Sequence, residues 1–170
     1  SRLLLRQSCA AAMLMSNCVE FIVTDMAIIK SGATRVPLND MLGEFEVKYM
    51  LENSQTKAII VGPQFYSLIS KIHEQLPALE LIVGLTEDAP DGFLSWKEFL
   101  AERPDTNPDV NVAPYHRAAL GYSGGTTGLP KGIVQTQESL AMALYCHLIE
   151  LEMVSDDKIL AMSPLPHSVG

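Results

Sequence analysis

A stretch of glycine and hydroxyl residues at positions 123–131 is the part of the sequence best suited to chemistry. It reads Ser-Gly-Gly-Thr-Thr-Gly-Leu-Pro-Lys. Glycines let backbone N–H groups approach phosphate oxygens, hydroxyls add hydrogen-bond donors, and a lysine adds a mobile positive charge. The pattern therefore predicts a loop that holds a polyphosphate. The residues assigned to this loop are Ser123, Gly124, Gly125, Thr126, Thr127, Gly128 and Lys131.

The spacing separates this loop from two common nucleotide-binding motifs. A Walker loop ends in Gly-Lys-Ser/Thr and opens a helix, whereas here Pro130 precedes Lys131 and β-prone residues follow it. The loop also does not match the dinucleotide-binding motif GxGxxG, because two of its glycines are contiguous. The alternative is a glycine-rich hairpin whose lysine points to water. Against it, Lys131 is the only Lys or Arg between positions 117 and 158, so it does not belong to a charged face.

Alternating helices and short apolar strands are predicted around the loop, which indicates parallel α/β layers and not an antiparallel sandwich. Helices are expected at 17–32, 43–53, 64–75, 94–101 and 137–151. Strands are expected at 33–38, 58–61, 79–83, 118–122, 133–136 and 159–162. Two β-prone runs thus flank the glycine-rich loop, which predicts a β-hairpin.

The helix expected at 17–32 has a signal at each end. Asn17 can accept a hydrogen bond as N-cap, Glu20 can complete a capping box, and Gly32 suits a left-handed end. Apolar residues recur at helical spacing at Val19, Ile22, Val23, Met26 and Ile29. In the helix at 43–53, the residues expected to face inward are Phe45, Tyr49 and Met50.

Composition excludes several classes of protein. The chain is 48% hydrophobic with a formal net charge of −8, which argues against nucleic-acid binding and against a polybasic membrane surface. It contains no apolar run long enough to span a bilayer. Three cysteines without CxxC spacing, and four scattered histidines, predict no zinc site and favour a reducing compartment, hence a cytoplasmic location. Ala10–Ala12 faintly resemble part of a signal peptide, but Arg6 and Gln7 interrupt the preceding apolar run.

Acidic residues gather in one part of the chain. Positions 74–109 hold nine acids and two bases, together with four prolines, which is typical of a solvated connection. We therefore divide the sequence into an α/β part at about 17–85, an acidic connection at about 86–114, and a part at about 115–170 that carries the loop hairpin, a helix and a strand.

Residues 120–131 match, position by position, the phosphate-loop signature of the adenylate-forming enzymes: acyl- and aryl-CoA ligases, peptide-synthetase adenylation domains and luciferases. Residues 15–21 and 36–39 resemble early segments of the same family. Pro164-Leu165-Pro166-His167 resembles its next motif, with Pro166 in place of the usual aromatic residue. The sequence is most similar to fatty-acid–CoA ligases.

This resemblance implies a parallel layered α/β sheet with a phosphate-loop hairpin, as part of the family's large N-terminal domain. It implies ATP-dependent activation of a small carboxylic acid, expected to be a fatty acid, with Mg²⁺ and with CoA as acceptor. By the same resemblance, the loop would hold the β- and γ-phosphates of ATP. His167 would lie by the acid or its acyl pocket; the alternative is a histidine bonded to backbone at a helix start.

The family's adenine-binding Gly-x-Thr-Glu, its ribose-binding Thr-Gly-Asp and its small C-terminal domain do not occur in these residues. We therefore expect a partial N-terminal domain that does not complete adenylation alone, with no catalytic residue of its own. Two alternatives remain open at this point: a non-catalytic relic that binds nucleotide or pyrophosphate, and a purely structural α/β domain.

Overall fold

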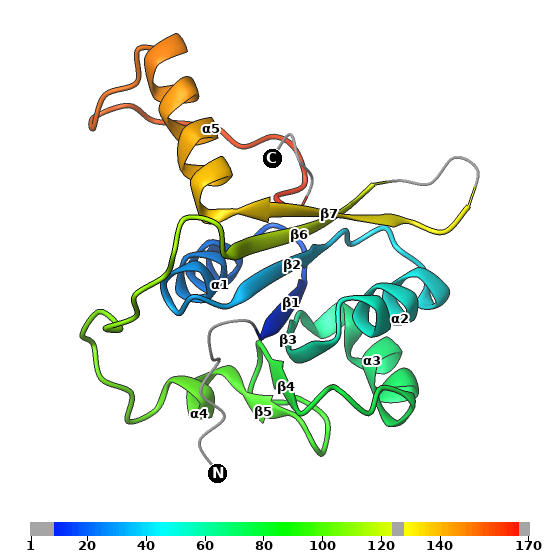
Figure 1. The fold of residues 1–170 in the computed structure, drawn as a ribbon. Coiled ribbons are helices and arrows are strands. Elements are labelled where there is room, and N and C mark those ends of the chain that lie inside the picture. The colour runs from blue at the N-terminus through cyan, green and yellow to red at the C-terminus, as the bar shows by residue number, and fades with distance from the viewer. Residues whose placement is uncertain (1–8, 124–127, 167–170) are drawn as a thin grey trace.

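The computed structural model describes residues 9–123 and 128–166, and it shows one seven-stranded sheet with strand order β5-β4-β3-β1-β2-β6-β7 (Figure 1). The strands are β1 (Ala10–Leu14), β2 (Thr34–Leu38), β3 (Thr56–Val61), β4 (Leu81–Gly84), β5 (Leu94–Ser95), β6 (Arg117–Ser123) and β7 (Lys131–Thr136). The helices are α1 (Val19–Lys30), α2 (Glu44–Asn53), α3 (Tyr66–Ile72), α4 (Trp96–Leu100) and α5 (Gln137–Glu150), with short 3-10 turns at Pro63–Phe65 and His73–Gln75.

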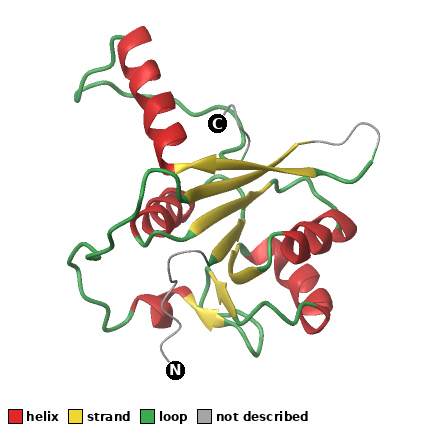
Figure 2. Cartoon of the chain, viewed as in Figure 1, coloured by secondary structure: helices red, strands yellow, loops and turns green. Residues whose placement is uncertain are grey.

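The sheet is parallel from β5 to β6, and it ends in an antiparallel hairpin of β6 and β7 (Figure 2). The pairing of β2 with β6 consists of one register pair, Arg35 with Ala119. The hairpin pairing is much longer and runs to Ser123 opposite Lys131. The expected parallel α/β layers with a loop-bearing hairpin are therefore confirmed.

The central strand β1 is the element that the sequence did not reveal. All five of its residues are buried, and it pairs with β2 on one side and β3 on the other. Its three alanines lack the β-branched side chains that mark a strand, and a strand buried on both faces shows no alternation of polar and apolar residues. The weak resemblance of Ala10–Ala12 to a signal peptide has a structural explanation, because these small residues lie between helical layers.

Two apolar cores lie on the two faces of the sheet. Helices α2 and α3 cover one face, and α1 covers the other (Figure 1). Alternate residues of β1 serve the two cores, with Leu14 on the α2 and α3 side and Met13 on the α1 side. β3 is buried on both faces in the same way, as its continuous apolar run predicted.

Helix α1 is oriented differently from the prediction. The expected capping box is wrong: the N-cap is Cys18, without a side-chain hydrogen bond. Gly32 does adopt the expected left-handed conformation, with φ of 74°. The apolar residues at helical spacing lie mostly on the solvent side, and Val19 is 75% exposed. Asp25 faces inward instead, because its carboxylate bonds the Arg35 guanidinium at 2.8 Å on the neighbouring strand β2.

Three smaller expectations are also corrected. Phe45 points away from the core and is 67% exposed, while Tyr49 and Met50 face inward as predicted. The helix expected at 94–101 is divided into the short strand β5 and the shorter helix α4. Residues 159–162 are irregular and not a strand; Met162 is 86% exposed, and the segment is not part of the seven-stranded sheet.

Helix α5 confirms the prediction for its position but is isolated from both cores. Its start is fixed by a capping box between Thr136 and Ser139. None of its residues is buried, although several are large and apolar. In Figure 1 the helix stands away from the sheet beyond β7. Among the described residues, β7 and α5 therefore contribute nothing to either core, whereas β6 contributes Leu120.

Candidate functional site

The carboxyl ends of the parallel strands gather polar residues at one edge of the sheet. Since β1, β2, β3 and β6 run in the same direction, the residues that follow them meet there. Ser16 follows β1, Asp40 follows β2, Gln64 follows β3, and Ser123 ends β6. This is the edge at which open α/β sheets bind ligands.

Ser123 and Lys131 form the base of the predicted phosphate loop. They are opposite each other in the β6–β7 register, at the two points where the loop leaves and rejoins the hairpin. The Ser123 Oγ lies 3.5 Å from the Lys131 carbonyl oxygen, which makes that bond weak and leaves the hydroxyl available to a ligand. The Lys131 side chain is exposed and has no carboxylate partner among residues 9–123 and 128–166. Both side chains can therefore turn toward an anion.

Gly128, the last loop glycine that the structure describes, stands in open space. A Cβ added to it would meet no heavy atom within 4 Å. Packing therefore does not require glycine there, while the bare backbone leaves room for a ligand to approach. The other loop residues assigned from the sequence, Gly124, Gly125, Thr126 and Thr127, lie outside the described residues, as does His167.

Tyr122 attaches the loop-bearing hairpin to the parallel part of the fold, a role that the sequence did not suggest. Its hydroxyl donates toward the Asn53 Oδ1 at 2.8 Å and the Met50 carbonyl oxygen at 3.2 Å, both at the end of α2. Burial raises the pKa of this hydroxyl, which therefore stays protonated and able to donate at neutral pH. The sequence did contain a signal for this role, a tyrosine directly before the glycine-rich loop. Tyrosine combines an apolar ring that can pack with a hydroxyl that can form a hydrogen bond.

A second set of polar contacts ties the strand ends together. The Ser16 Oγ donates to the Asp40 Oδ2 at 2.9 Å and accepts from the Gln64 Nε2 at 3.0 Å, so three parallel strands are joined at this edge. The irregular segment 163–166, which precedes His167, reaches the same edge through the side chain of Asn17. Sequence reasoning assigned Asn17 to a helix cap and gave Asp40 and Gln64 no role.

Metal binding by side chains alone is not supported within the described ranges. No group of three or more His, Cys, Asp or Glu side chains is placed to hold a metal ion among residues 9–123 and 128–166. Mg²⁺ commonly binds through one or two carboxylates together with substrate phosphates. In the same ranges, no helix has the length and apolar character to cross a membrane.

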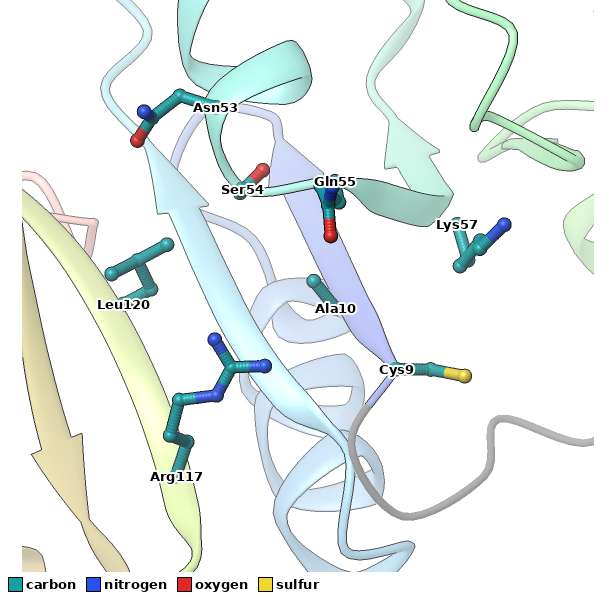
Figure 3. A pocket seen from close by; sticks show the side chains of 8 residues that line it. All are labelled: Cys9, Ala10, Asn53, Ser54, Gln55, Lys57, Arg117 and Leu120. Atoms are coloured by element: carbon teal, nitrogen blue, oxygen red, sulfur yellow. The ribbon is translucent and has the colours of Figure 1, made fainter.

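A pocket of about 170 Å³ lies at the opposite, amino edge of the sheet (Figure 3). Its lining includes Cys9 and Ala10 at the start of β1, Lys57 in β3 and Arg117 at the start of β6. Ser123 is at the other end of β6 from Arg117. The pocket is therefore distinct from the predicted phosphate loop.

Comparison with known proteins agrees with the fold. The profile of the AMP-binding enzyme family matches residues 4–170, and the chain belongs to this family. Its sequence is similar to a long-chain-fatty-acid–CoA ligase of Thermus thermophilus, with 30% identity over 143 residues, 83% of this chain and 26% of that protein.

Solved structures show the same relationship. The anthranilate CoA ligase AuaEII, in complex with anthranoyl-AMP, matches with a TM-score of 0.79 and 30% identity over 82% of this chain and 27% of its own. A long-chain-fatty-acid–CoA ligase from Archaeoglobus fulgidus matches with a TM-score of 0.85 and 25% identity, over 95% of this chain and 32% of its own. The 170 residues thus span about a third or less of these relatives.

Proposed function

We propose that these residues form part of the large N-terminal domain of a longer acid–thiol ligase. In that protein a carboxylate oxygen attacks the α-phosphorus of ATP, the bond to the bridging oxygen breaks, and pyrophosphate leaves. The thiol of CoA then attacks the acyl-adenylate carbonyl, and AMP leaves. The parts of the domain would be the α/β part at about 17–85, the acidic connection at about 86–114, and the loop-bearing part at about 115–170.

The observation that carries this proposal is the placement of Ser123 and Lys131 across the hairpin, at the carboxyl edge of the sheet. A carboxylate is already an anion, so the first step needs no general base. It needs positive charge and donors on the phosphates, and accurate positioning. We assign the β- and γ-phosphates to the loop from Ser123 to Lys131, with magnesium accompanying the nucleotide and balancing its charge. The accessible Lys131 ammonium would follow the departing pyrophosphate.

For the acid, we propose a fatty acid with His167 beside its carboxylate. Two of the three relatives described above are ligases of long-chain fatty acids, while the third acts on anthranilate. Pyrophosphate exchange measured with a series of fatty acids and with aromatic acids distinguishes these classes. We also place the protein in the cytoplasm, because Cys9, Cys18 and Cys146 are all free thiols.

Calorimetry on the 170-residue chain tests the loop directly. We expect Mg·ATP and pyrophosphate to bind, and Lys131→Ala to weaken both by about tenfold or more, because one charge-assisted contact is lost. Lys158→Ala removes another exposed lysine away from the hairpin and should leave binding unchanged. Absence of heat with either ligand, on protein shown to be folded, would contradict the assignment and favour a purely structural domain.

A further inference from the structure

Helix α5 presents large apolar side chains on opposite sides, and none of its residues is buried. Met142 and Ile149 point to one side and Leu144 to the other, given 3.6 residues per turn, and all three are more than half exposed. Positions 139–149 contain no Lys, Arg, Asp or Glu, although a solvated helix normally has a charged face. A helix that is apolar all round is typical of the interior of a large protein.

Strand β7, which leads into α5, is uncovered in the same way. Ile133 and Val134 are consecutive, so their side chains point to opposite faces of the sheet, and both are more than half exposed. β7 is also the last strand in the sheet order, so its outer edge has no neighbouring strand among residues 9–123 and 128–166. The strand contains no proline and only one charged residue, although these are the features that protect free sheet edges in proteins.

The exposed surfaces of β7 and α5, residues 131–150, are called here the β7–α5 region, and their arrangement limits what can cover them. A membrane surface is disfavoured, because helices that bind membranes carry basic residues on their polar side, whereas Lys131 is the only Lys or Arg between positions 117 and 158. A second copy of the chain would cover one side and leave the opposite side of β7 and α5 in water. A partner that covers both sides must surround the region.

Further polypeptide of the same ligase can surround it. The 170 residues span about a third or less of the relatives described above, so a ligase of that length has more than enough additional chain. In Figure 2 the helix α5 stands clear of the other helices, with space around it for further layers. Such layers would remove apolar surface from water on every side of α5, which is the main favourable contribution to packing.

We propose that the β7–α5 region is an interior part of the ligase's large domain, enclosed by apolar side chains from outside these 170 residues. This inference rests on the proposed function, which supplies the longer ligase. It predicts that a charged substitution in α5 is tolerated in the 170-residue chain, where the position is exposed, and is costly in the ligase, where the position is enclosed.

Two methionine substitutions test this, made both in the 170-residue chain and in the longer ligase. Met142→Lys changes α5, and Met41→Lys is the matched control, since Met41 lies before α2 and is also exposed. In the 170-residue chain we expect both variants to melt within about 1 °C of the unmodified chain. In the ligase, Met142→Lys should lower the melting midpoint by about 5 °C or more, and Met41→Lys by no more than about 1 °C. Equal midpoints for the two ligase variants would overturn the inference.

Amide hydrogen exchange tests the enclosure without any substitution, so it does not depend on whether a variant folds. Peptides from α5 should exchange at least about 100-fold more slowly in the ligase than in the 170-residue chain, because enclosure suppresses local opening. Peptides from β1 are the control, since this strand is already buried and should be protected in both proteins. Equal exchange of α5 in the two proteins would overturn the inference.

Sedimentation and vesicle flotation distinguish the other occupants. We expect Met142→Lys to change neither the mass of the ligase in sedimentation nor its flotation with vesicles of phosphatidylcholine and phosphatidylglycerol. A dimer that this variant converts to a monomer would assign the surface to a second copy, and flotation that it abolishes would assign the surface to a membrane; either result overturns the inference. None of these measurements requires activity, so absence of acid-dependent pyrophosphate exchange in the unmodified ligase would refute the proposed function separately.

Discussion

Strands β1 and β7 belong to the same sheet but are used in opposite ways. All five residues of β1 are buried, whereas Lys131 to Gln135 in β7 are exposed, with Ile133 at 56%. Helices α2 and α3 pack in the core on one face of the sheet, and α1 packs in the core on the other face. Helix α5, which follows β7, has no buried residue. Burial is therefore concentrated in the half of the sheet that does not carry the glycine-rich loop.

This difference predicts that the stability of the fold and the proposed ligand binding are separable in this chain. Apolar burial around β1 is the main favourable contribution to folding. The loop hairpin is connected to that part by the β2–β6 pairing, by Leu120 of β6, which is part of the core on the α2 and α3 side, and by the Tyr122 hydroxyl. Substitutions in the two regions should thus affect different measurements, and a substitution at their junction should affect both.

The largest effect is expected for Gly128→Val. A valine there would block the approach of phosphate to the backbone, so acid-dependent pyrophosphate exchange in the longer ligase should fall about 10³-fold, more than for Lys131→Ala. Because a Cβ at this position meets no neighbouring atom, the urea midpoint of the 170-residue chain should not change. Exchange that persists at the unmodified rate in both variants would remove the functional assignment of the loop.

The next largest effect is expected for Leu14→Ala in β1. Leu14 is fully buried, and truncating such a residue leaves a cavity, so the free energy of unfolding should fall by about 3 kcal/mol. Urea denaturation followed by circular dichroism measures this loss. A loss comparable to that of a surface substitution would show that β1 does not stabilise the fold as its burial indicates.

A smaller effect is expected at the junction, for Tyr122→Phe. Removing the hydroxyl leaves the Asn53 Oδ1 without its donor, which should lower the free energy of unfolding by about 1 kcal/mol. The same variant should weaken pyrophosphate binding, because the base of the loop is then less firmly held. Calorimetry and urea denaturation on one preparation test both parts, and an effect on neither would mean that Tyr122 does not couple the two regions.

The smallest effect is expected for Ile133→Ala in β7. Its side chain is largely exposed in the 170-residue chain, so the free energy of unfolding should change by no more than about 0.5 kcal/mol. Leu14→Ala, measured under the same denaturation conditions, is the direct comparison. Equal losses at the two positions would contradict the contrast between β1 and β7.

Sequence-based predictions of structure were most accurate where a residue type favours a particular local conformation. The flanking strands of the glycine-rich loop, the left-handed Gly32 and the buried run of β3 all follow from nearest-neighbour chemistry, and the structure has each of them. The chemistry of the loop itself stays a prediction. Strand β1 was missed because alanine carries no β-specific signal, and its position depends entirely on neighbours distant in the chain.

The errors in α1 and at residues 159–162 have the same origin. Apolar spacing suggested which side of α1 would be buried, but the ion pair between Asp25 and Arg35 shows that the opposite side faces the sheet. An apolar run at 159–162 suggested a strand, but a strand also needs a partner. Likewise, the pairing of Asn17 with Ser163 and Leu165 could not be deduced from local spacing, since it joins distant segments.

The single register pair between β2 and β6 has a mechanical consequence. Ser123 lies four residues beyond Ala119, the paired residue, which corresponds to about 13 Å of strand. A tilt of only about 5° at that pair would move the rim of the loop by about 1 Å, roughly the tolerance within which phosphate-holding groups must be placed. Small adjustments where β2 meets β6 would thus become larger displacements at the proposed phosphate loop, and the hydrogen bond from the Tyr122 hydroxyl to Asn53 limits them.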